Sequence, residues 1–137
     1  MKTLKKSSTS IFLKIIAKLA ENTYLKIDTN GPDSGIMPLI VEKLGQPVQI
    51  LSTEYQIYSL AHYYTQCGDL IADPDMTFAV NINNPDIIYP LTIQNPMFYS
   101  EGLFMQKGKW LLNKPIQADM TSFANQWLKN LKWQQNL

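Results

Sequence analysis

The chain contains no arginine, a single cysteine and a single histidine among its 137 residues. Arginine is the residue best suited to bidentate contacts with phosphate and guanine, so its absence counts against sequence-specific recognition of nucleic acid. One cysteine, Cys67, cannot form an internal disulfide. This excludes a disulfide-stapled secreted scaffold and favours a reducing, cytoplasmic setting.

Long apolar runs are also absent. No stretch approaches the ~18 uninterrupted apolar residues that a membrane span needs. The apolar segment near the N-terminus is interrupted by Lys14 and Lys18 and is followed by no small-residue cleavage pattern, so we interpret it as a helix rather than an export signal. No phosphate-binding loop, dinucleotide glycine fingerprint or zinc-ligand spacing occurs, and we expect no cofactor.

Charge is distributed unevenly along the chain although the net charge is only +1. Residues 1–26 carry a net charge of +5, residues 27–105 carry −8 and residues 106–137 carry +4. The two ends are therefore rich in lysine, and the middle is acidic. This pattern predicts that terminal helices and a central sheet present surfaces of opposite sign.

The apolar content of 45% is enough for a core in one domain spanning residues 1–137. Apolar residues at helical spacing predict a helix over about 8–22, capped by one of the serines 7, 8 and 10, and a last helix capped by Asp119. Alternating or β-rich segments between them predict strands, which are expected at 24–28, 37–44, 48–52, 55–64, 76–82, 87–93, 98–105 and 110–112.

Short turns join these strands, with turn-forming residues at 30–35, 45–47, 83–86 and 107–109. Strands that follow each other through short turns pair antiparallel. The sequence therefore predicts an α+β fold. We expect a mainly antiparallel, curved sheet of about six strands, with an N-terminal and a C-terminal helix packed on one of its faces.

The stretch from His62 to Phe78 holds the only histidine, the only cysteine and three carboxylates, and it is the first place to look for a site. The candidate binding residues are five from this stretch and one from the turn at 30–35. They are His62, Tyr64, Asp69, Asp73 and Asp75, together with Asp33. Aspartates that only stabilise turns, by accepting hydrogen bonds from nearby backbone amides, would give the same sequence pattern. If Asp33 shares a site with the Asp69–Asp75 segment, the two must lie at the same end of the sheet.

The residues of this stretch could serve a metal or small-ligand site, or a cysteine nucleophile. One imidazole nitrogen and three carboxylates, from His62, Asp69, Asp73 and Asp75, would suit a hydrolase that uses magnesium, manganese or calcium, or a small-ligand site. A Cys67–His62 nucleophile lacks any recognisable context. The spacing of the acids does not match a calcium loop, and we expect no catalytic residue.

Several short motifs occur in a characteristic order. They are Gly31-Pro32-Asp33-Ser34-Gly35, Met37-Pro38-Leu39, Val41-Glu42-Lys43-Leu44-Gly45, Ala61-His62-Tyr63-Tyr64, Gly68-Asp69-Leu70, Asp73-Pro74-Asp75-Met76 and Phe123-Ala124 with Trp127. Over residues 24–133 this series resembles an uncharacterised family of small proteins from phages, plasmids and conjugative elements. The resemblance implies a mobile-element setting in a cytoplasmic host and implies no activity.

Together these observations favour a non-catalytic accessory protein that binds a macromolecular partner. The acidic sheet would meet a basic protein, whereas the lysine-rich terminal helices would meet nucleic acid. Trp133 lies beyond the last apolar stripe and is a candidate exposed anchor for a partner. The sequence does not specify the oligomeric state.

Overall fold

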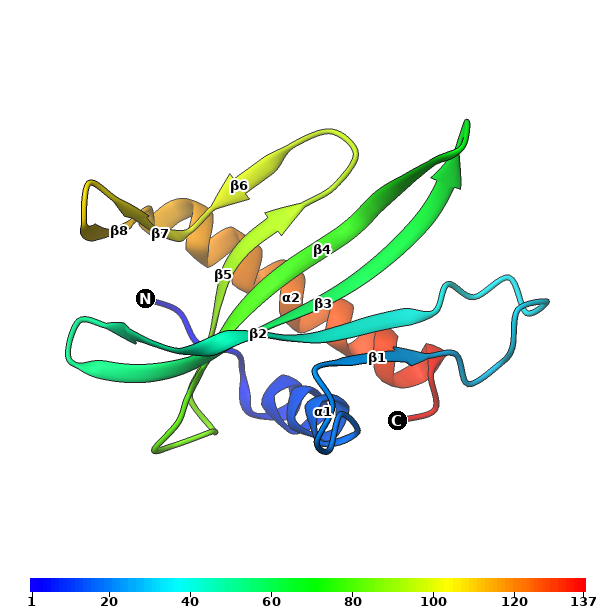
Figure 1. Cartoon of the computed structure of the whole chain (residues 1–137), viewed down its shortest axis with the longest axis horizontal. Helices are drawn as coiled ribbons and strands as arrows, with labels where there is room; N and C mark the ends of the chain where they lie inside the picture. The colour runs from blue at the N-terminus through cyan, green and yellow to red at the C-terminus, as the bar shows by residue number, and fades with distance from the viewer.

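The computed structural model describes all residues from 1 to 137 as eight strands and two helices (Figure 1). In chain order the elements are α1 (Lys6–Ala17), β1 (Tyr24–Ile27), β2 (Leu39–Ile50), β3 (Thr53–Gln66), β4 (Asp69–Asn81), β5 (Ile88–Gln94), β6 (Tyr99–Glu101), β7 (Leu103–Gln106), β8 (Lys109–Leu112) and α2 (Lys114–Gln134).

The first six strands form one sheet in sequence order, β1-β2-β3-β4-β5-β6, and every neighbouring pair is antiparallel. Strands β7 and β8 form a separate two-stranded hairpin. The prediction of an α+β fold built on an antiparallel sheet of about six strands is confirmed.

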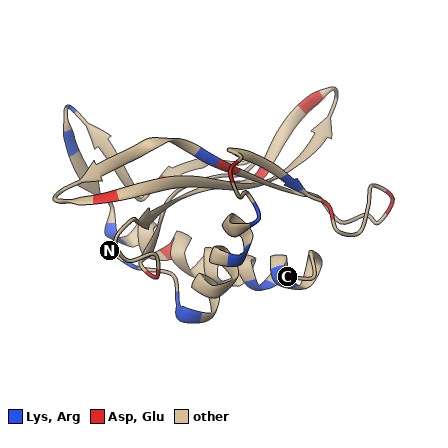
Figure 2. Ribbon diagram, turned by 60° about the horizontal axis from the view of Figure 1, so that its bottom comes forward, with Lys and Arg blue, Asp and Glu red and all other residues tan.

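Both helices lie on the same face of the sheet (Figure 2). Alternation along β4 turns Met76, Phe78 and Val80 toward them, where they join a core of 19 buried residues. Phe12 of α1 packs against Phe78, with ring centroids 4.8 Å apart, and Leu128 of α2 is fully buried in the same core. The helices therefore use their apolar stripes to close one side of the sheet.

The opposite face of the sheet is covered only at one end. A second, smaller cluster consists of Ile50, Tyr55, Ala79, Leu91 and Leu103, and Leu103 belongs to β7. Trp110 of β8 packs against this cluster and donates a hydrogen bond from Nε1 to the carbonyl of Gln49 at 3.2 Å. The β7–β8 hairpin thus shields one end of this face and leaves the other end open to solvent.

Both helices begin earlier than predicted. Helix α1 starts at Lys6 after Lys5, whose side chain makes no capping hydrogen bond, and Ser8 is buried inside the helix. Helix α2 starts at Lys114, because Asn113 accepts a hydrogen bond from the Ile116 amide at 3.3 Å and a proline occupies the first turn. The predicted serine and Asp119 caps are wrong. Neither helix is long and apolar enough to cross a membrane.

Three strand boundaries also differ from the prediction. The strand predicted at 76–82 begins at Asp69, so that the turn-like stretch Asp69–Asp75 belongs to β4. The expected turn at 45–47 is a bulge, so that β2 continues from Leu39 to Ile50 with a register shift between Leu44 and Val48. The expected strand 98–105 breaks at Gly102, which separates β6 from β7. A Cβ at Gly102 would lie 2.8 Å from the Cβ of Gln117, so that only glycine fits this close approach to α2.

Gln117 joins three separate parts of the fold through its buried side chain. Its Oε1 accepts a hydrogen bond from the Lys2 amide at 2.7 Å. Its Nε2 donates to the Lys2 carbonyl at 2.8 Å and to the Pro90 carbonyl at 3.1 Å. The N-terminal segment, β5 and α2 are therefore held together by one side-chain amide.

We expect Gln117→Met to lower the free energy of unfolding by about 2 to 4 kcal/mol, because it keeps the side-chain volume but removes the partner of three backbone groups, one of them, the Pro90 carbonyl, in a buried contact. Urea denaturation followed by circular dichroism measures this. The matched control is Gln126→Met, at an exposed position of the same helix. A loss no larger in Gln117→Met than in Gln126→Met would contradict the role of Gln117.

Candidate functional site

The open face of the sheet carries a row of six polar residues, one from each strand. Each residue lies directly opposite the next in the strand register, which places all six on one face. From β1 to β6 this polar row consists of Tyr24, Glu42, Ser59, Thr77, Thr92 and Glu101. Side-chain hydroxyls occupy the centre of the row, where Thr77 and Thr92 are hydrogen-bonded to each other.

Asp75 lies beside the polar row, opposite Ala61 in the register, and two hydroxyl groups converge on it. Its carboxylate accepts hydrogen bonds from Tyr63 at 3.1 Å and from Ser59 at 3.4 Å. Burial, and then the negative charge of Asp75 together with this hydrogen bond, raise the pKa of Tyr63 to about 12. The phenol therefore remains protonated and serves as a hydrogen-bond donor at neutral pH.

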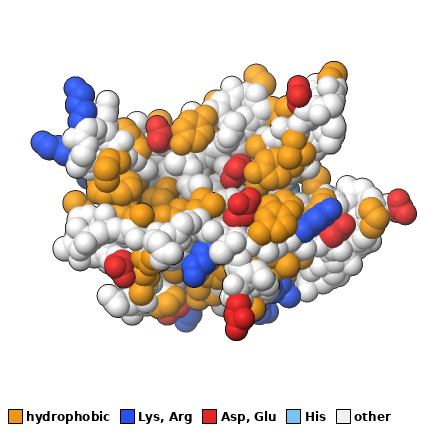
Figure 3. Space-filling model, in the orientation of Figure 1, with side chains coloured by type: hydrophobic (Ala, Val, Ile, Leu, Met, Phe, Trp, Pro, Cys, Tyr) orange, Lys and Arg blue, Asp and Glu red, His pale blue; other side chains and the backbone are white.

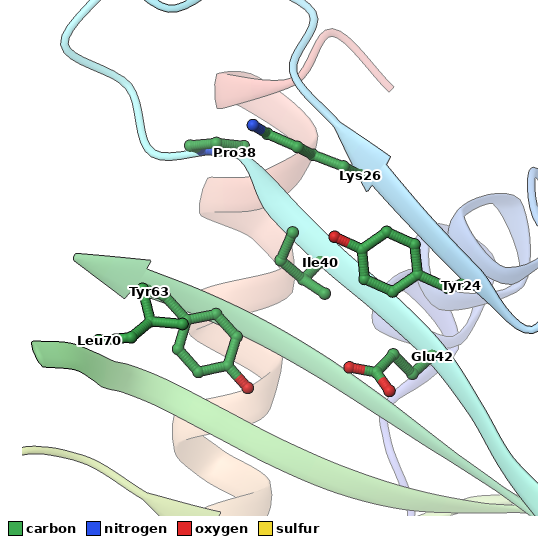
Figure 4. Close-up of a pocket in the computed structure, with 7 residues that line it drawn as sticks. All are labelled: Tyr24, Lys26, Pro38, Ile40, Glu42, Tyr63 and Leu70. Carbon is green, nitrogen blue, oxygen red and sulfur yellow. The ribbon is translucent and has the colours of Figure 1, made fainter. Parts of the chain in front are cut away.

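A groove of about 380 Å³ opens on the same face, between the β1–β2 edge and the long β3–β4 hairpin. Figure 4 shows the residues that line it, which are Tyr24, Lys26, Pro38, Ile40, Glu42, Tyr63 and Leu70. Two of them, Tyr24 and Glu42, are the β1 and β2 members of the polar row. The groove therefore continues the row toward the projecting hairpin.

Most acidic residues lie on the sheet and its turns, whereas lysines occur in both layers, on the helices and in β1, β2 and β8 (Figure 2). The open face shows acidic side chains between hydrophobic ones in the space-filling view (Figure 3).

His62 does not face the open side of the sheet. It is 4% exposed, and its ring packs edge-on against Trp127 of α2, with centroids 5.5 Å apart. Its Nε2 atom is buried without a hydrogen-bond partner. Burial lowers the pKa of His62, and the charge of Asp73 raises it by a smaller amount. The imidazole is thus a neutral part of the interface between sheet and helix.

The remaining predicted residues are dispersed. Asp69 is exposed at the start of β4, next to the turn formed by Cys67 and Gly68. Tyr64 lies two residues after His62 on β3, so it points to the same side of the strand as His62. Asp75 lies on the other face, and no group of three or more histidine, cysteine, aspartate or glutamate side chains in the chain is placed to hold a metal ion. The structure does not bring His62, Asp69, Asp73 and Asp75 together.

The geometric condition on Asp33 is met in part. Its loop, between β1 and β2, lies at the same end of the sheet as the tip of the β3–β4 hairpin, but the two project in different directions (Figure 1). The groove lies between their bases, with Pro38 on one side and Leu70 on the other. Asp33 itself is exposed and does not line the groove.

Of the six predicted site residues, only Asp75 belongs to the hydrogen-bonded group beside the polar row. Glu42, Ser59 and Tyr63 were not predicted from the sequence to belong to one site. The alternation in β4 indicates which residues share a face. Which residues of β3 and β2 lie opposite those of β4 depends on the strand register. The bulges at Leu44/Val48 and Ala61/Tyr63 shift this register, so the pairing cannot be read from alternation alone.

These features define a two-layer α+β domain with one open, acidic and tyrosine-bearing sheet face. The chain belongs to a family described as a domain of unknown function (DUF6908), whose model matches residues 8–137. Searches of the curated proteins and of the solved structures find no match to the chain. The predicted resemblance to an uncharacterised domain family is therefore confirmed at the level of the family.

The buried state of His62 gives an expected pH dependence of stability. The unfolded chain takes up a proton on this residue near its ordinary pKa of 6.5, and the folded protein does so only at lower pH. Between these values the unfolded state binds more protons, so stability decreases as the pH falls, by up to about 1.4 kcal/mol per pH unit.

Urea unfolding between pH 7.5 and pH 5 measures this slope. We expect His62→Phe, which keeps an aromatic ring against Trp127, to lose the part of the slope below about pH 6.5. Equal slopes in the two proteins would show that His62 is not buried in its neutral form.

The contact between Tyr63 and Asp75 predicts a change in the titration of one tyrosine. We expect Asp75→Asn to lower the pKa of Tyr63 from about 12 toward 10.0, leaving the part of the shift that burial causes. Carbon NMR of the Tyr63 Cζ atom follows this ionisation. Asp69→Asn, at the start of β4 near the hairpin turn, removes the same charge and should leave the Tyr63 titration unchanged; an equal effect would contradict the contact.

Proposed function

We propose that this protein is a non-catalytic binding protein whose open sheet face accepts a basic segment of another protein. The observation that carries the proposal is the polar row, which runs through all six strands and lies beside Asp75. An extended chain laid along such a row meets a hydrogen-bonding side chain from every strand. Acidic groups at Glu42, Asp75 and Glu101 favour a partner of positive charge.

The setting proposed for this interaction is the cytoplasm of a host that carries a mobile genetic element, where the protein would act as an accessory factor. Two features support this setting. The motif series resembles proteins of such elements, and the lone cysteine, Cys67, is free and exposed on the hairpin turn. A free, exposed thiol suits a reducing compartment.

A second candidate function is nucleic-acid binding on the opposite side of the molecule. Trp133 is 80% exposed near the end of α2, and it lines a shallow depression together with Lys129 and Lys132. An exposed indole beside two ammonium groups offers base stacking and phosphate contacts. The sequence prediction that Trp133 is exposed is correct, and its role as an anchor remains a prediction.

Titration with a labelled peptide of alternating lysine and threonine residues, followed by fluorescence anisotropy at low salt, tests the leading proposal. We expect binding that weakens as salt is added, because the contacts involve exposed charges. Asp75→Asn combined with Glu101→Gln should weaken binding about 3- to 10-fold.

The matched control removes two charges from elsewhere, with Asp86→Asn in the β4–β5 turn and Asp119→Asn on α2. It should change the affinity less than the variant of the sheet face. Equal losses in the two double variants, or no binding of the lysine peptide at low salt, would overturn the proposal. Preferential binding of a single-stranded oligonucleotide, lost in Trp133→Ala, would instead favour the second candidate.

A further inference from the structure

The groove between β1, β2 and the β3–β4 hairpin has walls of a particular chemistry. Tyr24 and Tyr63 contribute aromatic rings, Ile40 and Leu70 contribute apolar surface, and Glu42 contributes a carboxylate. At about 380 Å³ the groove is large enough for one long side chain and too small for a folded element. Its occupant is therefore a single projecting group.

The polar atoms of the groove are placed asymmetrically. The Glu42 carboxylate and the Tyr63 hydroxyl lie toward one end, and the amine of Lys26 extends toward Pro38 at the other end (Figure 4). Strand register explains this separation, since Tyr24 lies opposite Glu42 and Lys26 lies opposite Ile40. One end of the groove is thus acidic, and the chain's own ammonium group is directed away from it.

The acidic end also has a negative electrostatic field. The charges of Asp75 and Glu42 both raise the pKa of Tyr63, although burial raises it most. Glu42 is half-buried, which strengthens its interaction with a neighbouring charge relative to a fully solvated carboxylate. A cation that enters between the two tyrosine rings would gain from this field and from the ring faces.

We propose that this groove is a recognition pocket for one lysine or arginine side chain of the protein partner, with its cationic end at Glu42 and its methylene stem against Tyr24, Ile40 and Tyr63. The inference rests on the proposed function and names the group that the open face selects. The rest of the polar row supplies contacts to the segment on either side of this residue.

The test uses the full chain and a five-residue peptide with one central lysine between valine and threonine residues. A second peptide replaces this lysine with norleucine, which keeps the stem and removes the charge. Amide NMR shifts of the protein report where each peptide binds. We expect saturable shifts around Ile40, Tyr63 and Leu70, with affinity for the norleucine peptide lower by about tenfold.

Glu42→Gln should weaken binding of the lysine peptide about tenfold, whereas Glu54→Gln, the same charge change at an exposed position of β3 outside the polar row, should change it less than twofold. Tyr24→Leu, at an exposed position on the edge strand, should weaken binding about threefold through loss of one ring. Unchanged melting temperatures would show that each variant is folded.

Equal losses in Glu42→Gln and Glu54→Gln, or shifts that lie outside the groove, would overturn the pocket. If the longer alternating peptide still binds the sheet face in that case, the proposed function stands without the pocket. If the single-lysine peptide binds in the groove while the longer peptide ignores Asp75 and Glu101, the pocket stands and the wider face does not take part.

Discussion

A six-stranded sheet has two faces, and in this chain two helices are available to cover them. Both helices pack on the same face, where their apolar stripes and the sheet form a core of 19 buried residues. The second face is shielded at one end by the β7–β8 hairpin, which brings Leu103 and Trp110 over a small apolar cluster. The part of this face that stays open to solvent must carry polar side chains, because a large exposed apolar patch would promote association with other molecules.

This constraint explains the distribution of side chains along the strands. In β3 and β4, Leu60 and Met76 face the helices and are fully buried, whereas Ser59 and Thr77 alternate with them on the other side. The edge strands β1 and β6 are short, with 4 and 3 residues, which limits pairing with other chains at the sheet edges. The broad face therefore offers more surface for contact than either of these short strands.

The parts of the fold that could be predicted from the sequence are those that local patterns determine. Alternation at Met76–Ile82 and 87–93 located the second half of β4 and the core of β5, and the Lys107-Gly108 turn located the β7–β8 hairpin. The start of α2 was missed because Asn113 and Pro115 form a helix-initiating pair as readily as a loop. Pro47 and Pro74 indicated turns, but both lie within strands beside bulges, where a missing amide is tolerated.

The site was harder to predict than the fold, because its residues come together across strands rather than along one. Asp75 was identified among a local cluster of acids, yet its partners Ser59 and Tyr63 are 16 and 12 residues away and meet it through the register of β3 with β4. The same holds for Tyr24 and Glu42, whose pairing depends on the loop that returns β2 to β1. No periodicity within one segment contains this information.

Polarity alone does not distinguish a binding surface from a solvated sheet face, since every uncovered face needs hydrophilic side chains. Two properties of this face go beyond that need. Solvation alone would leave Asp75 hydrated, but it is half-buried and accepts hydrogen bonds from two hydroxyl groups of β3. A solvated face also needs no groove, but here two tyrosine rings and a carboxylate line one. Because paired strands hold these groups in place, the groups themselves would lose little conformational entropy if a partner's side chain entered the groove.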